Sequence, residues 1–388
     1  MNNFFEKYDW KTILNEYPLA EKKFNKEEYY RILCPEFPEF LKKYINLPIL
    51  QRLSGIGLLC GTDWTALYKN RFFYSRLDHS VGVALIIWNF TNDKTQTIAG
   101  LLHDISTTVF SHVSDFRKGD ALTQTSTEEP TAKMILEDEK LCCLLQEDGI
   151  NPKDVVDYHI YPIADNEIPC LSADRLEYMY PSGLALDGSW TLEEIAKTYG
   201  DLVILKNEDN RDELGFKSIE IAELYCKRFC MIGHILQLNE NKLSLQLLSQ
   251  IMTKAVELNV LDEQDFMTLS EVEIIKKIEL YVHNKVLNLD EQKFATMYNT
   301  FRKMTKVEHT NEEISEEEYF CVSINVKQRY INPLVKVVSD GSSNCVQAKR
   351  LSEVSDFANC LIKDFLSYED TKFGCVKWIL PKDWHLEK

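Results

Sequence analysis

The sequence of 388 residues has no long apolar run, and we expect no secretory leader. A helix needs about 18 or more consecutive apolar residues to span a membrane, and we expect no membrane-spanning segment here. The first 24 residues, MNNFFEKYDWKTILNEYPLAEKKF, mix charged and apolar side chains and lack the apolar core of a signal peptide. We therefore expect a cytoplasmic protein.

The cysteines also lack a pattern. There are 11 of them, an odd number, and none forms the CxxC spacing of a structural zinc site. Free cysteine is among the most frequently buried residue types, so we interpret these residues as reduced, buried thiols.

Positive charge is in deficit. The sequence contains 61 acidic and 44 basic residues, which gives a formal net charge of -17. A field of this sign repels a polyphosphate backbone at long range, so nucleic acid is not an expected partner. A small anionic substrate is compatible with it, because a local cluster of metal ion and arginine dominates at short range.

What the sequence does contain is helical periodicity through most of its first 310 residues, so the expected fold class is mainly α. An irregular segment at 158–171 contains two prolines, and a helix is expected to follow it at Ser172. The other main expected helices are 49–59, 79–90, 97–105, 132–149, 218–236, 243–258 and 271–288.

The pattern changes towards the C-terminus. An acidic stretch at 308–319 is expected to be a solvated linker or an exposed helix. After it, alternating and β-branched residues predict strands near 319–330, 333–338 and 372–380. Between the last two, 351–368 predicts an amphipathic helix with Ser352 as its N-cap.

These patterns suggest three parts. They are a helical lead-in at 1–45, a helical core at 46–310 and a small α+β C-terminal region at 311–388.

Four polar residues stand at the ends of apolar helical segments, where a buried polar side chain needs a partner. They are His79 in SRLDHSVGVA, His103 and Asp104 in LLHDIS, and Asp174 in SADRLEYMY. Two imidazoles and two carboxylates suit a divalent metal ion and leave positions for water and phosphate oxygens. A single histidine beside apolar residues is more often a hydrogen-bonded core residue, but the four residues together favour a metal site.

In their order and flanking sequence these residues resemble the HD-domain metal-dependent phosphohydrolases, and most of all their dGTPase-like branch of deoxynucleoside-triphosphate triphosphohydrolases. The similarity runs over roughly residues 40–290. Its segments are LQRLSGIG (50–57), SRLDHSVGVA (75–84), LLHDISTTVFSH (101–112) and SADRLEYMY (172–180).

This resemblance implies a helical HD-domain core with a small α+β C-terminal appendage. It also implies that His79, His103, Asp104 and Asp174 hold one divalent metal ion, for which Fe, Mn, Ni, Zn and Mg are all candidates.

Arg76 and His112 match residues that contact or line the substrate site in this family. Arg76 precedes His79 by three residues, so both face the same side of a helix, and its planar guanidinium suits phosphate oxygens. Asp115 is spaced to orient the imidazole of His112. With Asp104, these three are the expected catalytic residues. A surface ion pair for Arg76 and a helix-capping pair for His112 and Asp115 are the alternatives.

Two further residues follow from the same resemblance. Arg175 is expected to contact phosphate directly or through a neighbour, and Tyr178 matches a tyrosine that lies beside the nucleotide in the family. A structural arginine and a core tyrosine are the alternatives.

The sequence departs from the family at two histidines. The family pattern HDxGHxPFSH reads HDISTTVFSH here, with Thr107 in place of a histidine, and Thr127 stands where a second histidine is typical. A threonine hydroxyl does not titrate near neutral pH, and losing a general acid typically costs about 10²- to 10⁴-fold in rate. We therefore expect a metal site but no efficient triphosphohydrolase activity. A monophosphate, or a leaving group that needs less protonation, tolerates the loss better.

The predicted function is metal-dependent hydrolysis of a nucleotide or related phosphate ester by activated water. One alternative is a catalytically weakened member that binds nucleotide as a sensor or regulator. Another is an interaction protein with a structural metal. The expected partner is a small phosphorylated substrate, and the resemblance also suggests a homo-oligomer.

Overall fold

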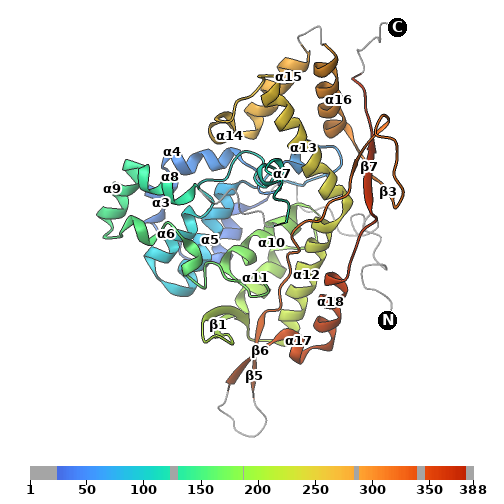
Figure 1. Cartoon of the computed structure of the whole chain (residues 1–388). Coiled ribbons are helices and arrows are strands. Elements are labelled where there is room, and N and C mark those ends of the chain that lie inside the picture. Colours follow the sequence, from blue (N-terminus) through green and yellow to red (C-terminus); the bar gives the residue numbers. More distant parts are fainter. Residues whose placement is uncertain (1–23, 123–129, 187, 284–287, 339–345, 382–388) are drawn as a thin grey trace.

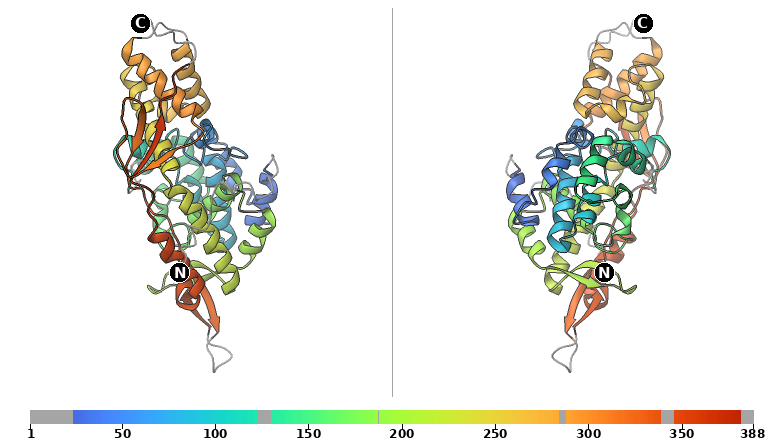
Figure 2. Two further views of the ribbon diagram at one scale, coloured as in Figure 1. Left: turned by 90° about the vertical axis from the view of Figure 1, so that its right-hand side faces the viewer. Right: turned by 90° about the vertical axis from the view of Figure 1, so that its left-hand side faces the viewer.

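The structure is a computed structural model that describes residues 24–122, 130–186, 188–283, 288–338 and 346–381. These residues are mainly helical and carry two small sheets, which confirms the expected fold class. Figure 1 shows α15 and α16 at one end of the molecule and the β5–β6 ribbon at the other. The two side views show the same elongated outline (Figure 2).

The first half of the chain forms short helices around one long, buried helix, α5. The elements are α2 (Lys26–Leu33), α3 (Leu41–Ile45), α4 (Pro48–Gln51), α5 (Arg76–Thr91), α6 (Lys94–Leu102), α7 (Val113–Arg117), α8 (Thr131–Glu137) and α9 (Glu139–Glu147).

Longer helices follow in the second half. They are α10 (Ala173–Ala185), α11 (Leu192–Gly200), α12 (Ile219–Gln237), α13 (Asn239–Glu257), α14 (Asp265–Thr268), α15 (Glu271–His283) and α16 (Leu289–Lys303), with α17 (Leu351–Val354) and α18 (Asp356–Leu366) near the C-terminus.

Three expected helices are shortened or divided. The helix expected at 49–59 ends at Gln51 and continues only as a 3₁₀ turn. The helix expected at 132–149 breaks at Asp138, whose side chain accepts a hydrogen bond from the Leu141 amide and so starts α9. In 351–368 the N-cap of α18 is Ser355 rather than Ser352. In each case a local cap or turn sets the end of the helix, although the helical spacing of apolar residues continues beyond it.

One sheet joins distant parts of the chain. Its order is β1 (Leu202–Lys206), β2 (Asp212–Phe216), β5 (Leu334–Val338) and β6 (Val346–Arg350). Strands β2 and β5 pair in parallel, while the outer pairs are antiparallel. The β1–β2 hairpin lies in a stretch where no strand was expected.

The second sheet corrects two expectations. Its order is β3 (Glu308–Thr310), β7 (Phe373–Lys377) and β4 (Tyr319–Val322), and all pairs are antiparallel. Strand β3 therefore occupies part of the acidic stretch expected to be a linker or exposed helix. Cys321 and Cys375 lie opposite each other on β4 and β7 and form a disulfide, so the expectation of reduced thiols is wrong for this pair.

The C-terminal region packs into both hydrophobic clusters of the helical part. Ile331, Val335 and Leu351 lie in the cluster built around α5, α10 and α12. Val322 and Val376 lie in the cluster built around α13, α15 and α16. The division of the chain at residues 45 and 310 stays a prediction. Within the described residues, no helix has the length and apolar character needed to cross a membrane.

Candidate metal centre

Three helix ends bring the predicted metal ligands to one place. A capping box starts α5: the Ser75 hydroxyl accepts from the Asp78 amide at 3.1 Å, and this puts His79 in the first turn. At the start of α10 the Ser172 hydroxyl accepts from the Arg175 amide at 3.2 Å, and this puts Asp174 in the first turn. His103 ends α6, and Asp104 follows it directly.

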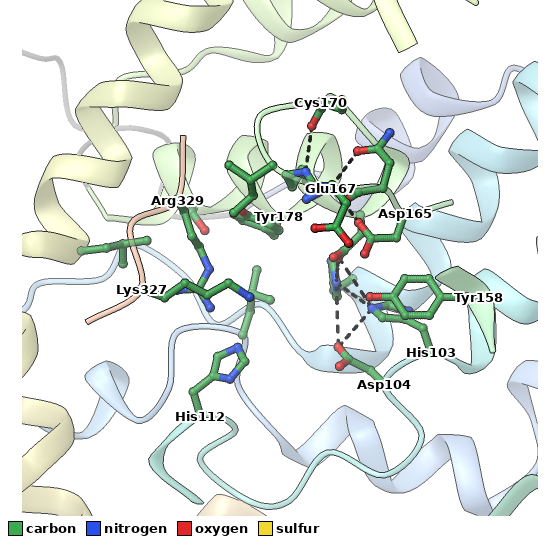
Figure 3. Close-up of a pocket in the computed structure, with 18 of the residues that line it drawn as sticks. His103, Asp104, His112, Tyr158, Asp165, Glu167, Cys170, Tyr178, Lys327 and Arg329 are labelled. Carbon is green, nitrogen blue, oxygen red and sulfur yellow. Dashed lines mark hydrogen bonds and ion pairs between the residues drawn. The ribbon is translucent and has the colours of Figure 1, made fainter. Parts of the chain in front are cut away.

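The four side chains converge on one point. The Nε2 atoms of His79 and His103 are 3.2 Å apart. Asp174 Oδ1 lies 3.0 Å from Nε2 of His79 and 3.7 Å from Nε2 of His103. Asp104 Oδ2 lies 3.8 Å and 3.5 Å from the same two nitrogens. Figure 3 shows His103 and Asp104 side by side at one wall of the pocket.

Hydrogen bonds fix which nitrogen of each imidazole faces this point. His103 Nδ1 donates to the Gly100 carbonyl at 2.7 Å, and His79 Nδ1 donates to Glu177 Oε2 at 2.5 Å. Both Nε2 atoms therefore face each other and two carboxylates. Such a donor set is mutually repulsive unless a cation lies within it, so these residues fit a divalent metal ion.

Glu177 is the residue of this centre that sequence reasoning missed. Its side chain is fully buried and also accepts hydrogen bonds from the hydroxyls of Tyr29, at 3.0 Å, and Tyr74, at 2.6 Å. A β-carbon at Gly82 would overlap its carboxylate, so α5 needs a glycine there. Glu177 follows Asp174 by three residues on α10, and that spacing was the available signal.

The charges of the centre support one another. Burial alone raises the pKa of Asp104, but the charges of Arg76, His103 and His79 hold that pKa well below its usual range. Burial likewise opposes ionisation of Asp174, whose pKa is also held low by the two histidines. For His79, burial lowers the pKa, but hydrogen bonds to Asp174 and Glu177 raise it to about 10.

Arg76 lies beside the ligands. Its guanidinium donates to Asp104 Oδ2 and to the Ser111 hydroxyl, each at 2.9 Å, and it lines the cavity. Arg76 was expected on the same side of the helix as His79, and both side chains line this cavity from the first turn of α5.

The centre opens into a cavity of about 540 Å³. His112 lines it, and His112 Nδ1 lies 2.9 Å from Oδ2 of the buried Asp115. Burial lowers the pKa of His112, and the hydrogen bond to Asp115 opposes this. The positive charges of Arg329 and Arg76 lower it further.

Arg175 and Tyr178 also line the cavity. The guanidinium of Arg175 donates to the Cys170 carbonyl at 2.9 Å and to Asp165 at 3.0 Å, and it also bonds to Asn166. Arg175 therefore holds the 165–170 loop in place. Burial raises the pKa of Tyr178 to about 12.

No family model matches the chain. It is 29% identical over 189 residues to the uncharacterized protein YdhJ of Bacillus subtilis, covering 48% of this chain and 54% of that one. It is 30% identical over 156 residues to the metal-dependent phosphohydrolase cns2 of Cordyceps militaris, covering 39% of this chain and 43% of that one. The chain spans about half the length of these curated relatives.

Two solved structures share the fold. A phosphohydrolase of Bacteroides thetaiotaomicron superposes with a TM-score of 0.58 at 16% identity, over 88% of this chain and 96% of the other. A hypothetical protein from Aquifex aeolicus superposes with a TM-score of 0.57 at 16% identity, over 88% of this chain and 92% of the other. These two comparisons show a shared fold, and the likeness to a metal-dependent phosphohydrolase covers less than half of each chain.

Membership of the HD-domain family, its dGTPase-like branch and the replaced histidines all stay predictions. Thr107 is buried and is not among the described residues that line the cavity. Its hydroxyl donates to Asp104 Oδ1 at 2.8 Å, and its carbonyl accepts from Arg52 at 2.8 Å. Thr127 lies outside the described residues.

The cavity is also lined by residues that no local sequence motif predicted. Arg211 comes from the β1–β2 hairpin, and Lys327 and Arg329 come from the segment between β4 and β5. Tyr158 places its ring centroid 4.9 Å from that of His103. Their approach depends on long-range chain topology, which periodicity does not reveal.

Proposed function

We propose that the chain is a metal-dependent phosphohydrolase that acts on a nucleotide or a related phosphate ester. One observation carries this proposal. His79, His103, Asp104 and Asp174 converge on one point at the wall of a cavity of about 540 Å³. Cavities of about 300–1,000 Å³ are typical of small-molecule sites.

In this proposal the four side chains hold one divalent metal ion, whose identity among Fe, Mn, Ni, Zn and Mg is open. When bound, such an ion lowers the pKa of water and polarises a phosphoryl oxygen. Glu177 and the Gly100 carbonyl hold the imidazoles with Nε2 towards the site. Arg76 and Thr107 hold the two oxygens of Asp104.

The remaining chemistry belongs to side chains at the cavity surface. The low pKa values of Asp104 and Asp174 keep both carboxylates ionised at neutral pH, as metal ligands must be, and make them weak proton acceptors. Burial keeps His112 neutral, and the Asp115 carboxylate orients its ring, which suits it to proton transfer. Arg76 is placed to neutralise charge that develops on phosphate oxygens.

Aromatic side chains support a nucleoside as the rest of the substrate. Tyr158 and Tyr178 line the same cavity, and flat rings of this kind pack against a base. Because Thr107 is tied to Asp104, we propose phosphate monoesters as substrates ahead of triphosphates. A cytoplasmic location and a homo-oligomeric state stay predictions.

A hydrolysis screen that measures inorganic phosphate, triphosphate and the nucleoside or nucleotide product tests this function. Purified protein is incubated with nucleoside monophosphates, deoxynucleoside triphosphates and cyclic nucleotides, each with Mn²⁺, Fe²⁺, Ni²⁺, Zn²⁺ or Mg²⁺. We expect turnover of at least one phosphate ester with at least one metal, and none after His103→Ala. Turnover that survives His103→Ala contradicts the proposal.

The second candidate function is a nucleotide sensor, which is favoured because Thr107 offers no titrating group. The same screen tests this candidate. In that case nucleotides raise the melting temperature of the wild type, but no substrate in the panel is hydrolysed.

A further inference from the structure

A segment that links the two sheets crosses the cavity. Residues 323–333 run from β4 to β5 and contribute Val326, Lys327 and Arg329 to its lining. We call this segment the strap. In a chain with a net charge of -17, residues 319–338 contain no aspartate or glutamate. The strap is therefore a local basic element in an acidic protein.

The strap is held at both ends and in its middle. The Cys321–Cys375 disulfide lies just before it, and Ile331 near its far end is fully buried. The Asn332 amide donates to the Pro169 carbonyl at 2.9 Å. In the middle, Gln237 of α12 donates to the Lys327 carbonyl at 2.9 Å. These contacts fix the backbone from which the two basic side chains project.

The basic side chains lie across the cavity from the metal centre. Figure 3 shows Lys327 and Arg329 near His112 and Tyr178, on the side of the pocket away from His103. The charge of Arg329 also lowers the pKa of both His112 and Tyr178, which agrees with this closeness.

We propose that Lys327 and Arg329, together with His112, bind the phosphate oxygens of the substrate that face away from the metal centre, so that the strap completes the active site. The inference rests on the proposed function and deepens it. A guanidinium binds two phosphate oxygens with its planar fork, and an ammonium adds a mobile point charge. In an acidic chain, such a basic wall is what draws a phosphate dianion into the cavity.

The test uses inorganic phosphate as the probe and compares wild type with Arg329→Ala, Lys327→Ala and Arg329→Lys. Binding is followed by the phosphate-dependent shift in melting temperature, and phosphate release is measured in parallel. Lys336→Ala is the matched control, since Lys336 is exposed on β5 and does not line the cavity.

We expect Arg329→Ala to weaken phosphate binding about 10- to 100-fold, as loss of a charge-assisted contact does, and to raise KM more than it lowers kcat. Lys327→Ala is expected to act in the same direction, Arg329→Lys to restore part of the binding, and Lys336→Ala to behave as wild type. The melting temperature without phosphate shows whether each variant is folded.

The outcomes separate the two proposals. If wild type and Arg329→Ala bind phosphate equally, or if wild type binds none, the role of the strap is overturned even where turnover is normal. If phosphate binding depends on Arg329 but no phosphate ester is hydrolysed, the anion site stands and the hydrolase function fails.

Discussion

Glu177→Gln isolates the contribution of the buried carboxylate behind His79. Glutamine keeps the volume of the side chain and an acceptor oxygen for Tyr29 and Tyr74, but it removes the charge that His79 Nδ1 faces at 2.5 Å. That contact fixes the ring and raises the basicity of Nε2. Loss of such a partner typically lowers metal affinity about 10- to 100-fold. We expect a loss of this size with the fold retained.

Calorimetric titration of metal-depleted protein with Mn²⁺ measures the effect. Tyr74→Phe is the matched control, because it removes a hydrogen bond to the same carboxylate but leaves the contact with His79 in place. Its affinity for Mn²⁺ should stay within about threefold of wild type, since the donor set is unchanged. Equal Mn²⁺ affinity in wild type and Glu177→Gln would refute the orienting role of Glu177.

Two further predictions concern stability. Arg350 forms an ion pair with the fully buried Glu213 at 2.6 Å. Arg350→Ala should therefore lower the free energy of unfolding, measured in urea, by about 3–5 kcal/mol, and adding Glu213→Gln should recover part of this loss. An unchanged unfolding midpoint in Arg350→Ala would show that the pair is dispensable. Hydrogen bonds to Asp370 and Glu240 raise the pKa of His309 from 6.5 to about 10. The stability that His309 contributes is therefore complete below pH 6.5 and is lost as the pH rises towards 10. The difference in melting temperature between wild type and His309→Gln should narrow over that range, and a constant difference would contradict this assignment.

That the four predicted ligands lie close together was largely predictable from sequence, because these residues sit beside local helix signals. Ser75 and Ser172 are recognisable N-caps, and each places a predicted ligand in the first turn that follows. His103 and Asp104 adjoin the end of α6, where a chain can direct two neighbouring side chains to one point. Glu177 was missed because its only signal, the spacing of three residues from Asp174, is not distinctive until the partners of the carboxylate are known.

The parts of the fold that escaped prediction depend on contacts between distant residues. The β1–β2 hairpin gains a partner only when β5 pairs with it in parallel, far along the chain. The expected strand at 319–330 ends at Val322, because beyond it the strap follows the cavity instead of a neighbouring strand. Arg329 could not be assigned to the site for the same reason.

Phosphate release before and after metal removal tests the central claim most directly. Wild type and Asp174→Asn are assayed with nucleoside monophosphates, first after chelation and then after Mn²⁺ or another divalent ion is restored. We predict that chelation abolishes turnover by wild type, that the metal restores it, and that Asp174→Asn stays inactive with a weaker metal affinity. Turnover that persists without metal, or in Asp174→Asn at the wild-type rate, would contradict the account.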